Sequence, residues 1–296
     1  MSVPSRNGFL LLDKKAGITS FDSLAIVKKT FATGKVGHTG TLDKFASGLL
    51  LALVGKGVKF APLFKNCIKY YDATLFFGME TDTLDPEGEV TARGGVPSQM
   101  EVESALEGFR GDILQSPPAY SAVHINGRRA HELAREGKEV EMKKRPATIH
   151  RLEILSWKPP LAEMCFCVSA GTYIRSLARD IALAAGSRAH LTALRRTGIG
   201  PFSIKDAVDC QSAGNLRPLD SELFEALSHP CFYLDDEEAA GFMHGRPLPD
   251  TLLPENPATI NSPYAGVFKK KPSGELLGLI EKRGGEWKYA YVFADN

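Results

Sequence analysis

The chain has 296 residues, of which 43% are apolar and 24% are charged, a composition typical of a globular protein with one large domain or two unequal ones. No apolar run approaches the roughly 20 residues that cross a bilayer, and residues 1–7 lack the apolar core of a signal peptide, so we expect a cytoplasmic protein without membrane contact. The net charge of +1 excludes the global basic excess of a nonspecific nucleic-acid binder.

The cysteines and histidines argue against a metal site. No cysteine belongs to a C-x-x-C pair, and none of the histidines forms H-E-x-x-H. Cys165 and Cys167 lie two apart in an alternating run, so they share one strand face, where small apolar packing suits them. We therefore expect reduced thiols and no metal. The cysteines are Cys67, Cys165, Cys167, Cys210 and Cys231.

The first predicted elements are a strand, a helix and a loop. Residues 8–13 form an apolar run that ends at turn residues, as in a short buried strand. A helix follows, capped by Ser20 and closed by Gly34 in the left-handed conformation. Residues 35–48 are rich in glycine and lack clean periodicity, so we expect an ordered loop. The apolar stripe of the helix consists of Phe21, Leu24, Val27 and Phe31.

Alternating apolar residues predict strands over residues 71–77 and 163–170, after a further apolar block at 49–54. A polar loop occupies residues 80–88. Ser98 and Glu101 have capping-box spacing and begin a helix that ends near Gly108.

Two basic segments stand out against the near-neutral total. Residues 128–151 carry eight Lys and Arg against four Glu, and residues 171–205 carry six against Asp180 alone. Such runs are either solvated faces or phosphate-binding surfaces. A type I′ turn at Asn126-Gly127 and a short helix over 128–135, stopped by Gly137, are predicted in the first segment. Because this segment has few core residues, we expect it to be mobile until a partner binds.

A helix with a clear apolar stripe begins at Ile174 and ends at Gly186. Arg175 and Arg179 are four residues apart and therefore share one face, so both guanidinium groups can face one ligand. Beyond Cys231 the chain is proline-rich and then reads as short strands.

Residues 276–282, the Gly284-Gly285 turn and the alternating residues 287–293 predict a hairpin in a small C-terminal β-barrel. We expect two domains, residues 1–230 and residues 231–296.

The loop that ends at Asp43 is the main candidate for chemistry. Residues 37–43 are glycine-rich, and Asp43 is their only carboxylate. The segment matches neither G-x-G-x-x-G nor the P-loop, so no nucleotide cofactor is expected. Gly37 to Gly40 also fits the G-x-x-G of KH RNA-binding modules. From spacing alone, Asp43 could instead cap a following helix.

Five blocks occur in the order found in TruB-type pseudouridine synthases, and the resemblance covers the first two thirds of the chain. It implies an α/β chain of the α+β type with the pseudouridine-synthase fold, a mixed, mostly antiparallel sheet flanked by helices. The blocks are residues 8–14, 35–43 with 46–49, 69–71, 116–122 running into 126–135, and 171–175 with 194–196.

The resemblance implies that Asp43 is the nucleophile, that Arg175 pairs with its carboxylate, and that Tyr71 stacks on the target base. A carboxylate can attack ribose C1′ or add to uracil C6, and the sequence leaves both routes open. Arg175 would keep Asp43 ionised and orient it bidentately. The last step, loss of the C5 proton, needs a base, either Tyr71 or water.

Further roles are implied for substrate-binding positions. His38 would fill the space that the extruded base leaves in the RNA, and Leu194 would pack against that base. Lys14 and Tyr173 would lie in or beside the cleft. The structural alternatives are an ordinary core position for Leu194 and support of the first helical turn for Tyr173.

The basic segment also matches a family insertion, about residues 121–145, that resembles a thumb closing on the RNA with Arg128 and Arg129. We expect it to order only when tRNA binds. The sequence departs from the family pattern at Lys44, Phe45, His124 and His131.

The implied partner is tRNA, recognised mainly by the shape of its TΨC stem-loop, with the uridine at position 55 as target. The enzyme is expected to be a monomer that needs no cofactor, metal or membrane. The C-terminal segment resembles a PUA-like RNA-binding domain, with a structural cap as the alternative. The rival functions are a non-catalytic tRNA-binding chaperone and a KH-like RNA-binding module.

Overall fold

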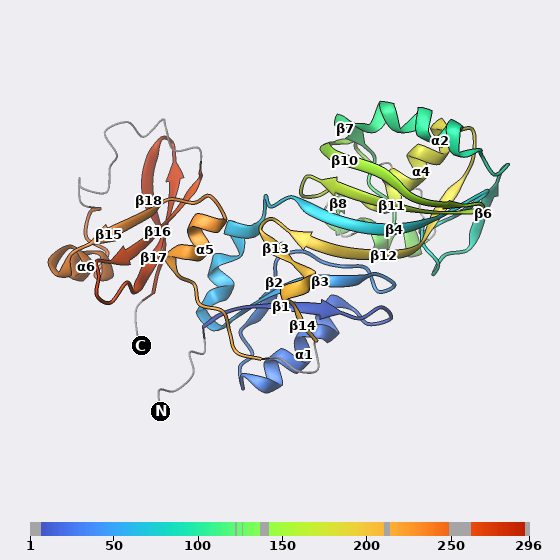
Figure 1. Ribbon diagram of the computed structural model, residues 1–296. Helices are drawn as coiled ribbons and strands as arrows, with labels where there is room; N and C mark the ends of the chain where they lie inside the picture. Colours follow the sequence, from blue (N-terminus) through green and yellow to red (C-terminus); the bar gives the residue numbers. More distant parts are fainter. Residues whose placement is uncertain are drawn as a thin grey trace.

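The computed structural model describes residues 7–121, 123–125, 127–136, 142–209, 214–248 and 262–293. These residues form one large sheet, a separate four-stranded sheet and flanking helices (Figure 1). Within these ranges no helix is both long and apolar enough to cross a bilayer. Asn126, Gly137 and Cys210, for which the sequence predicts a turn, a helix end and a reduced thiol, lie outside the described residues.

The large sheet is mixed and mostly antiparallel, which confirms the expected architecture. Its strands are β1 (Gly8–Lys14), β2 (Val36–His38), β3 (Ser47–Val54), β4 (Lys69–Phe77), β7 (Gly111–Gln115), β10 (Arg145–Lys158), β11 (Leu161–Val168), β12 (Ala189–Ile199), β13 (Phe202–Ser203) and β14 (Val208–Asp209). The order is β14-β1-β3-β12-β4-β11-β10-β7, with β2 on β3 and β13 on β12. Among the described pairs of this sheet, β1–β14 and β3–β12 are parallel and the others are antiparallel.

Helix α1 (Ser20–Thr30) covers one face of β1 and β3. Leu24 and Val27 of the predicted stripe are buried there, but Phe21 is 68% exposed. The N-cap is Thr19 rather than Ser20. Thr19 and Asp22 cap each other's backbone reciprocally, which leaves the Ser20 side chain free to bond elsewhere.

The C-terminus of α1 also differs from the prediction. Ala32, with φ of 46°, takes the left-handed position expected of Gly34. The amides of Ala32 and Thr33 donate to the carbonyls of Lys29 and Lys28, which completes a Schellman motif two residues before the glycine.

Helices α2 (Gln99–Leu106) and α4 (Ile174–Ala184) cover one face of the other half of the sheet (Figure 1). The Ser98–Glu101 capping box is confirmed, and the short 3₁₀ helix η2 (Glu107–Phe109) continues α2. Gly186, with φ of 69°, closes α4 as predicted.

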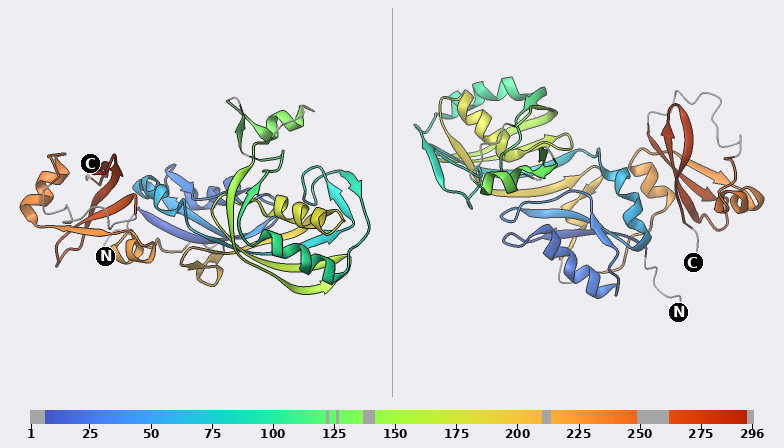
Figure 2. Two further views of the ribbon diagram at one scale, coloured as in Figure 1. Left: turned by 90° about the horizontal axis from the view of Figure 1, so that it is seen from above. Right: turned by 180° about the vertical axis from the view of Figure 1, so that it is seen from behind.

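Two hairpins extend from this half. β5 (Met79–Thr81) and β6 (Val90–Arg93) flank the polar loop. β8 (His124–Ile125) pairs with β9 (Arg128–Arg129) and leads into α3 (Ala130–Arg135), and this arm projects from the body (Figure 2, left). The predicted helix over 128–135 therefore starts two residues late, because Arg128 and Arg129 pair with β8.

The C-terminal sheet has the order β15-β16-β17-β18. The predicted hairpin is confirmed by β17 and β18, but the described strands form an open sheet rather than a closed barrel, since four strands are too few to close around a core. The elements are β15 (Cys231–Leu234), β16 (Tyr264–Lys269), β17 (Leu276–Arg283), β18 (Glu286–Val292) and helix α6 (Asp236–Met243).

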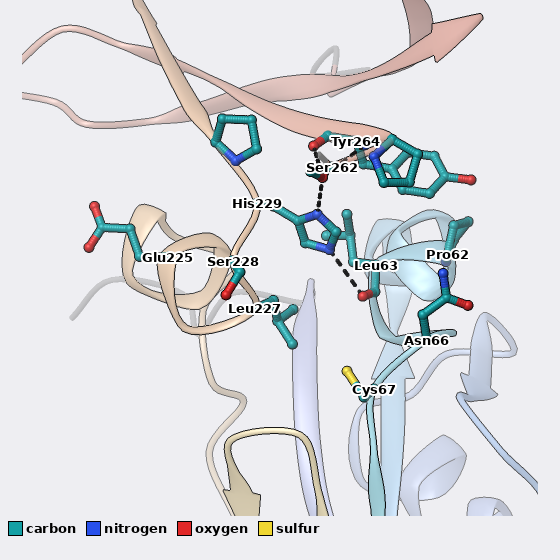
Figure 3. Close-up of a pocket in the computed structure, with 12 residues that line it drawn as sticks. Pro62, Leu63, Asn66, Cys67, Glu225, Leu227, Ser228, His229, Ser262 and Tyr264 are labelled. Atoms are coloured by element: carbon teal, nitrogen blue, oxygen red, sulfur yellow. Dashed lines mark hydrogen bonds between the residues drawn. The ribbon is translucent and has the colours of Figure 1, made fainter. Parts of the chain in front are cut away.

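The two sheets share a packed contact. Phe60 and Phe64 of η1 (Gly55–Phe64) lie in one apolar cluster with Phe224 of α5 (Ser221–Ala226) and Phe268 of β16. The nearby His229 bridges both sides: Nε2 lies 3.1 Å from the Leu63 carbonyl and Nδ1 lies 2.6 Å from Ser262 Oγ, beside a cavity of about 710 Å³ (Figure 3).

The pH dependence of stability tests this bridge. Burial lowers the pKa of His229 below 6.5, so the unfolded chain binds a proton that the folded chain does not, and the free energy of unfolding falls as the pH drops through that range. His229→Gln keeps hydrogen-bonding groups but cannot titrate. Urea unfolding at about pH 7.5 and 5.5 should show a smaller acid-induced loss in this variant.

The matched control is the exposed His150→Gln, which should leave the pH dependence of unfolding as it is in the parent chain. A pH dependence that is the same in His229→Gln and the parent chain would contradict the assignment.

Candidate active site

The candidate site lies where the two halves of the large sheet join. β3 and β12 pair only through Arg195–Ser47 and Arg196–Gly48, whereas β12 pairs with β4 along nearly its whole length. At this joint the chain leaves a cavity of about 320 Å³. Five of the predicted site residues line it: Asp43, Tyr71, Tyr173, Arg175 and Leu194.

These residues come from four separate elements. Asp43 lies in the loop between β2 and β3, Tyr71 in β4, Leu194 in β12, and Tyr173 and Arg175 at the start of α4. Tyr71 and Leu194 reach the same cavity because their strands are paired, with Leu194 opposite the next inward-facing residue of β4. The sequence predicts each of these residues separately, and the tertiary structure shows that they line one cavity.

The alternatives for the glycine-rich loop are wrong. The element after Asp43 is the strand β3, so Asp43 caps no helix. Gly37 to Gly40 runs from the end of β2 toward β3, whereas a KH loop joins two helices.

The carboxylate of Asp43 is held side-on by Arg175. Arg175 Nε lies 3.0 Å from Oδ2 and Nη2 lies 3.3 Å from Oδ1. The Arg175 side chain is 6% exposed, and that of Asp43 is 39% exposed. The arginine is therefore buried behind the carboxylate, and the carboxylate keeps one side open to the cavity.

Asp85 is a site residue that sequence reasoning missed. Its Oδ2 lies 3.2 Å from Arg175 Nη1, and its Oδ1 accepts hydrogen bonds from Thr83 Oγ1 and the Glu87 amide. The carbonyls of Thr83 and Tyr120 accept the remaining Arg175 bonds, at 2.8 and 3.0 Å. No periodicity marks Asp85 within its polar loop, so only the tertiary structure assigns it.

The electrostatics of Asp43 differ from the simple expectation that Arg175 lowers its pKa. Burial raises the pKa of Asp43 above the ordinary 3.8, the Arg175 charge opposes this shift, and the neighbouring Asp85 carboxylate adds to it. The balance leaves the pKa of Asp43 raised.

Two buried cations hold the Asp43 loop. Arg196 donates from Nε to the Leu49 carbonyl at 2.7 Å and from Nη2 to the Gly40 carbonyl at 3.0 Å. Lys14 donates to the carbonyls of Ile18 and Lys44. Lys14 therefore lies beneath the loop rather than in the cavity, and its charge helps to oppose the raised pKa of Asp43.

Gly48 is required at the joint itself. Its φ is +105°, and an added Cβ would lie 2.3 Å from the Arg196 carbonyl oxygen. No larger residue fits between the loop and β12 without moving the backbone.

The start of α4 is braced by Gln115, which sequence reasoning also missed. Gln115 Oε1 accepts from the Tyr173 amide at 2.8 Å, and Nε2 donates to the Tyr173 carbonyl at 3.0 Å. Arg179 does not face the cavities that Arg175 lines, contrary to the prediction that both guanidinium groups face one ligand, and instead pairs with Asp180 and donates to the Ser116 carbonyl.

A second, outer cavity of about 570 Å³ meets the first at Asp43 and Arg175. His38 and Arg129 line this outer cavity. Burial and the Arg196 charge lower the pKa of His38, which favours the neutral imidazole. Arg128 does not line it and instead pairs with Glu136 on the arm.

Three of the residues that depart from the family pattern can be located in the structure. Lys44 lies 3.5 Å from Glu87 at the rim, Phe45 packs against the core, and His124 lines the outer cavity. The side chain of His131 lies outside the described residues.

The comparisons decide the family. Residues 28–174 match the family described as TruB family pseudouridylate synthase (N terminal domain), and residues 175–222 match tRNA pseudouridylate synthase B C-terminal domain. The chain belongs to the TruB family of pseudouridylate synthases.

Relatives within the TruB family match along nearly the whole chain. A protein of Borreliella burgdorferi (strain ZS7), named tRNA pseudouridine synthase B, is 46% identical over 97% of this chain and 99% of its own. A protein of the same name from Corynebacterium aurimucosum is 39% identical over 97% and 96%.

Solved structures share the fold. A crystal structure of a Cbf5-Nop10-Gar1 complex matches 98% of this chain and 84% of that chain, with a TM-score of 0.69 and 22% identity. An archaeal box H/ACA sRNP Nop10-Cbf5 complex matches with a TM-score of 0.68. The pseudouridine-synthase fold predicted from the motifs is confirmed.

The Asp85 contact predicts a shift in the pH profile of a TruB-family enzyme. Asp85→Asn removes a negative charge that raises the pKa of Asp43, so the acidic limb of kcat/KM should move to lower pH. The plateau should also fall, because Arg175 loses a partner that orients it. Pseudouridine formation measured across pH checks both effects.

Asp82→Asn is the matched control, since Asp82 lies in the same loop but accepts from the Glu89 amide instead of facing Arg175. Its acidic limb should stay in place. A limb that is unmoved or raised in Asp85→Asn would contradict the electrostatic account.

Proposed function

We propose that this protein isomerises uridine to pseudouridine in the TΨC loop of tRNA, at position 55, with Asp43 as the nucleophile. The observation that carries the proposal is the Asp43 carboxylate, held side-on by buried Arg175 and open toward a cavity that Tyr71 also lines. The relatives named tRNA pseudouridine synthase B support tRNA as the substrate.

The inner cavity of about 320 Å³ suits a single nucleoside taken out of its stack. Tyr71 and Leu194 give the extruded uracil an aromatic and an aliphatic wall, and base–aromatic stacking recovers about 1–3 kcal/mol of the lost stacking. His38, on the outer side of Asp43, is placed to occupy the space that the base leaves. Tyr173, at the start of α4, adds to the wall.

The chemistry needs one carboxylate. If Asp43 attacks C1′, the C1′–N1 bond breaks and its electron pair leaves on uracil, whose carbonyls delocalise the charge. The base then turns, C5 bonds to C1′ as the aspartate leaves, and the product forms when C5 loses its proton and N1 gains one. If Asp43 adds to C6, the C1′–N1 bond breaks and the C1′–C5 bond forms on a base tethered through C6, and the aspartate leaves C6 when the C5=C6 double bond is restored with loss of the C5 proton. In either route a second carboxylate acid is unnecessary, because the leaving group is already a stable anion.

The buried guanidinium supports this chemistry. Burial alone would raise the pKa of Asp43 and favour its protonated form, and the charge of Arg175 opposes this by stabilising the ionised carboxylate. Because Arg175 contacts both oxygens of Asp43, it also fixes the direction of attack. Arg129 and the arm that carries it border the outer cavity and are positioned to contact RNA phosphates.

We further propose that the enzyme acts in the cytoplasm as a monomer. We also propose two domains, residues 1–230 and residues 231–296. The described strands of the small sheet support this boundary, because the first of them begins at Cys231. The small sheet is proposed to resemble a PUA-like module that adds to RNA affinity.

Asp43→Asn tests the nucleophile. The amide cannot attack carbon, so isomerisation should fall below detection, while tRNA affinity should stay within about tenfold, roughly 1.4 kcal/mol. Tritium release from tRNA labelled at uridine C5 measures the reaction, and filter binding measures the affinity. An active Asp43→Asn variant would overturn the proposal, and a parent chain that binds tRNA without releasing tritium would favour a chaperone.

Tyr71→Phe tests the base that removes the C5 proton, which we assign to the Tyr71 hydroxyl. The phenyl ring keeps the stacking surface, so RNA affinity should be retained while the rate falls by about 10²–10⁴, the usual worth of a general base. Single-turnover kinetics separate the two effects.

Tyr70→Phe, one residue away on the opposite strand face, is the control and should keep the parent rate. A Tyr71→Phe variant with the full rate would assign the step to water instead.

A further inference from the structure

An exposed phenylalanine stands beside the site. The spacing of α1 predicts that Phe21 packs into the core with Leu24 and Val27, yet its side chain is 68% exposed and lines the outer cavity that Asp43 and Arg175 also line. Most of the apolar surface of Phe21 therefore stays in water within this fold, where it gains little from burial. The ring is therefore available to a partner at the mouth of the site.

The helical turn that carries Phe21 is tied to the Asp43 loop. The adjacent Ser20 accepts a hydrogen bond from the Leu42 amide at 2.9 Å and donates one to the Leu42 carbonyl at 3.0 Å, and both bonds are buried. Leu42 directly precedes Asp43. The Thr19–Asp22 capping box fixes the first turn of the helix. The backbone at Phe21 is therefore anchored next to the loop that carries Asp43.

The surroundings of Phe21 suit a nucleic acid. The Lys28 ammonium lies over the ring, 4.6 Å from its centroid, and Arg129 lines the same outer cavity as Phe21. An apolar ring with cations in its surroundings matches a nucleobase with its flanking phosphates, since every base has a π-face and every linkage an anion.

We propose that Phe21 is an RNA-binding residue that stacks on an unpaired base of the same RNA whose target uridine occupies the inner cavity. This proposal rests on the proposed function. Phe21 touches no reacting atom, so its role is to bind and position the RNA. A phenylalanine side chain has two rotatable bonds and loses little side-chain entropy on stacking, and the Ser20–Leu42 bonds anchor the backbone beside it to the Asp43 loop.

The test is binding of an RNA hairpin that carries the T stem and loop of tRNA. Phe21→Ala should weaken binding by about 5- to 100-fold, the range that corresponds to losing one stacked base, and should raise KM with little change in kcat. Phe21→Leu keeps apolar bulk without a stacking face and should recover only part of the affinity. Phe21→Trp should bind at least as tightly as the parent chain.

Phe21→Trp also gives a direct signature. Stacking on a base should quench the new indole fluorescence when the hairpin is added, after subtraction of the signal from the two native tryptophans, Trp157 and Trp287. The matched control is Met100→Ala, an equally exposed apolar residue, 78% accessible, in the first turn of α2 and outside both cavities. It should leave hairpin binding unchanged.

The outcomes separate this proposal from the function on which it rests. If the parent chain isomerises uridine but Phe21→Ala binds the hairpin as tightly as the parent, or Phe21→Trp is not quenched, the stacking proposal is overturned and the function stands. If the parent chain forms no pseudouridine, the proposed function fails, whereas quenching of Phe21→Trp would still support the RNA contact. If Phe21→Ala has the same midpoint of thermal unfolding as the parent chain, a folding defect is excluded as the cause of weaker binding.

Discussion

The site depends on one buried guanidinium that serves two carboxylates. All three nitrogens of Arg175 have oxygen partners, and these come from the Asp43 loop, the Asp85 loop and the carbonyl of Tyr120. Segments far apart in the sequence therefore meet at one side chain. Removing it would leave the buried Asp85 carboxylate without its cationic partner and would also remove the partner of Asp43, so the site would be destabilised. The side chain that orients Asp43 therefore also connects these distant segments.

The same arrangement has two opposed effects on Asp43. Partial burial strengthens the electrostatic interactions that hold its carboxylate, but burial also raises its pKa, and the charge of Asp85 acts in the same direction. Arg175 and Lys14 oppose the shift. Because one side of Asp43 stays open to the cavity, the carboxylate can remain ionised without losing access to the substrate.

The cavity exists because the large sheet is weakly joined at its middle. β3 and β12 share two residue pairs. Beyond these pairs, Arg196 holds the Asp43 loop through the Gly40 carbonyl, and the missing Cβ of Gly48 lets the two strands approach each other. On the outer side, α1 brings Phe21 to the rim through Ser20 and Leu42. The apolar stripe of α1 is therefore interrupted at Phe21, which lies at the outer cavity rather than in the core.

The sequence by itself determined the strands β1, β4 and β11, the C-terminal hairpin, the capping box of α2, the family, and Asp43, Tyr71 and Arg175 as candidate site residues, because periodicity, capping chemistry and colinear motifs are local signals. Only the tertiary structure decided that Asp85 shares Arg175 with Asp43, and that Phe21 faces out rather than in. These depend on contacts between distant segments and on which helix face the sheet leaves uncovered. No local sequence pattern predicts these two contacts. The polar loop of Asp85 and the apolar stripe of Phe21 would have the same sequence pattern whether or not they lay beside the site.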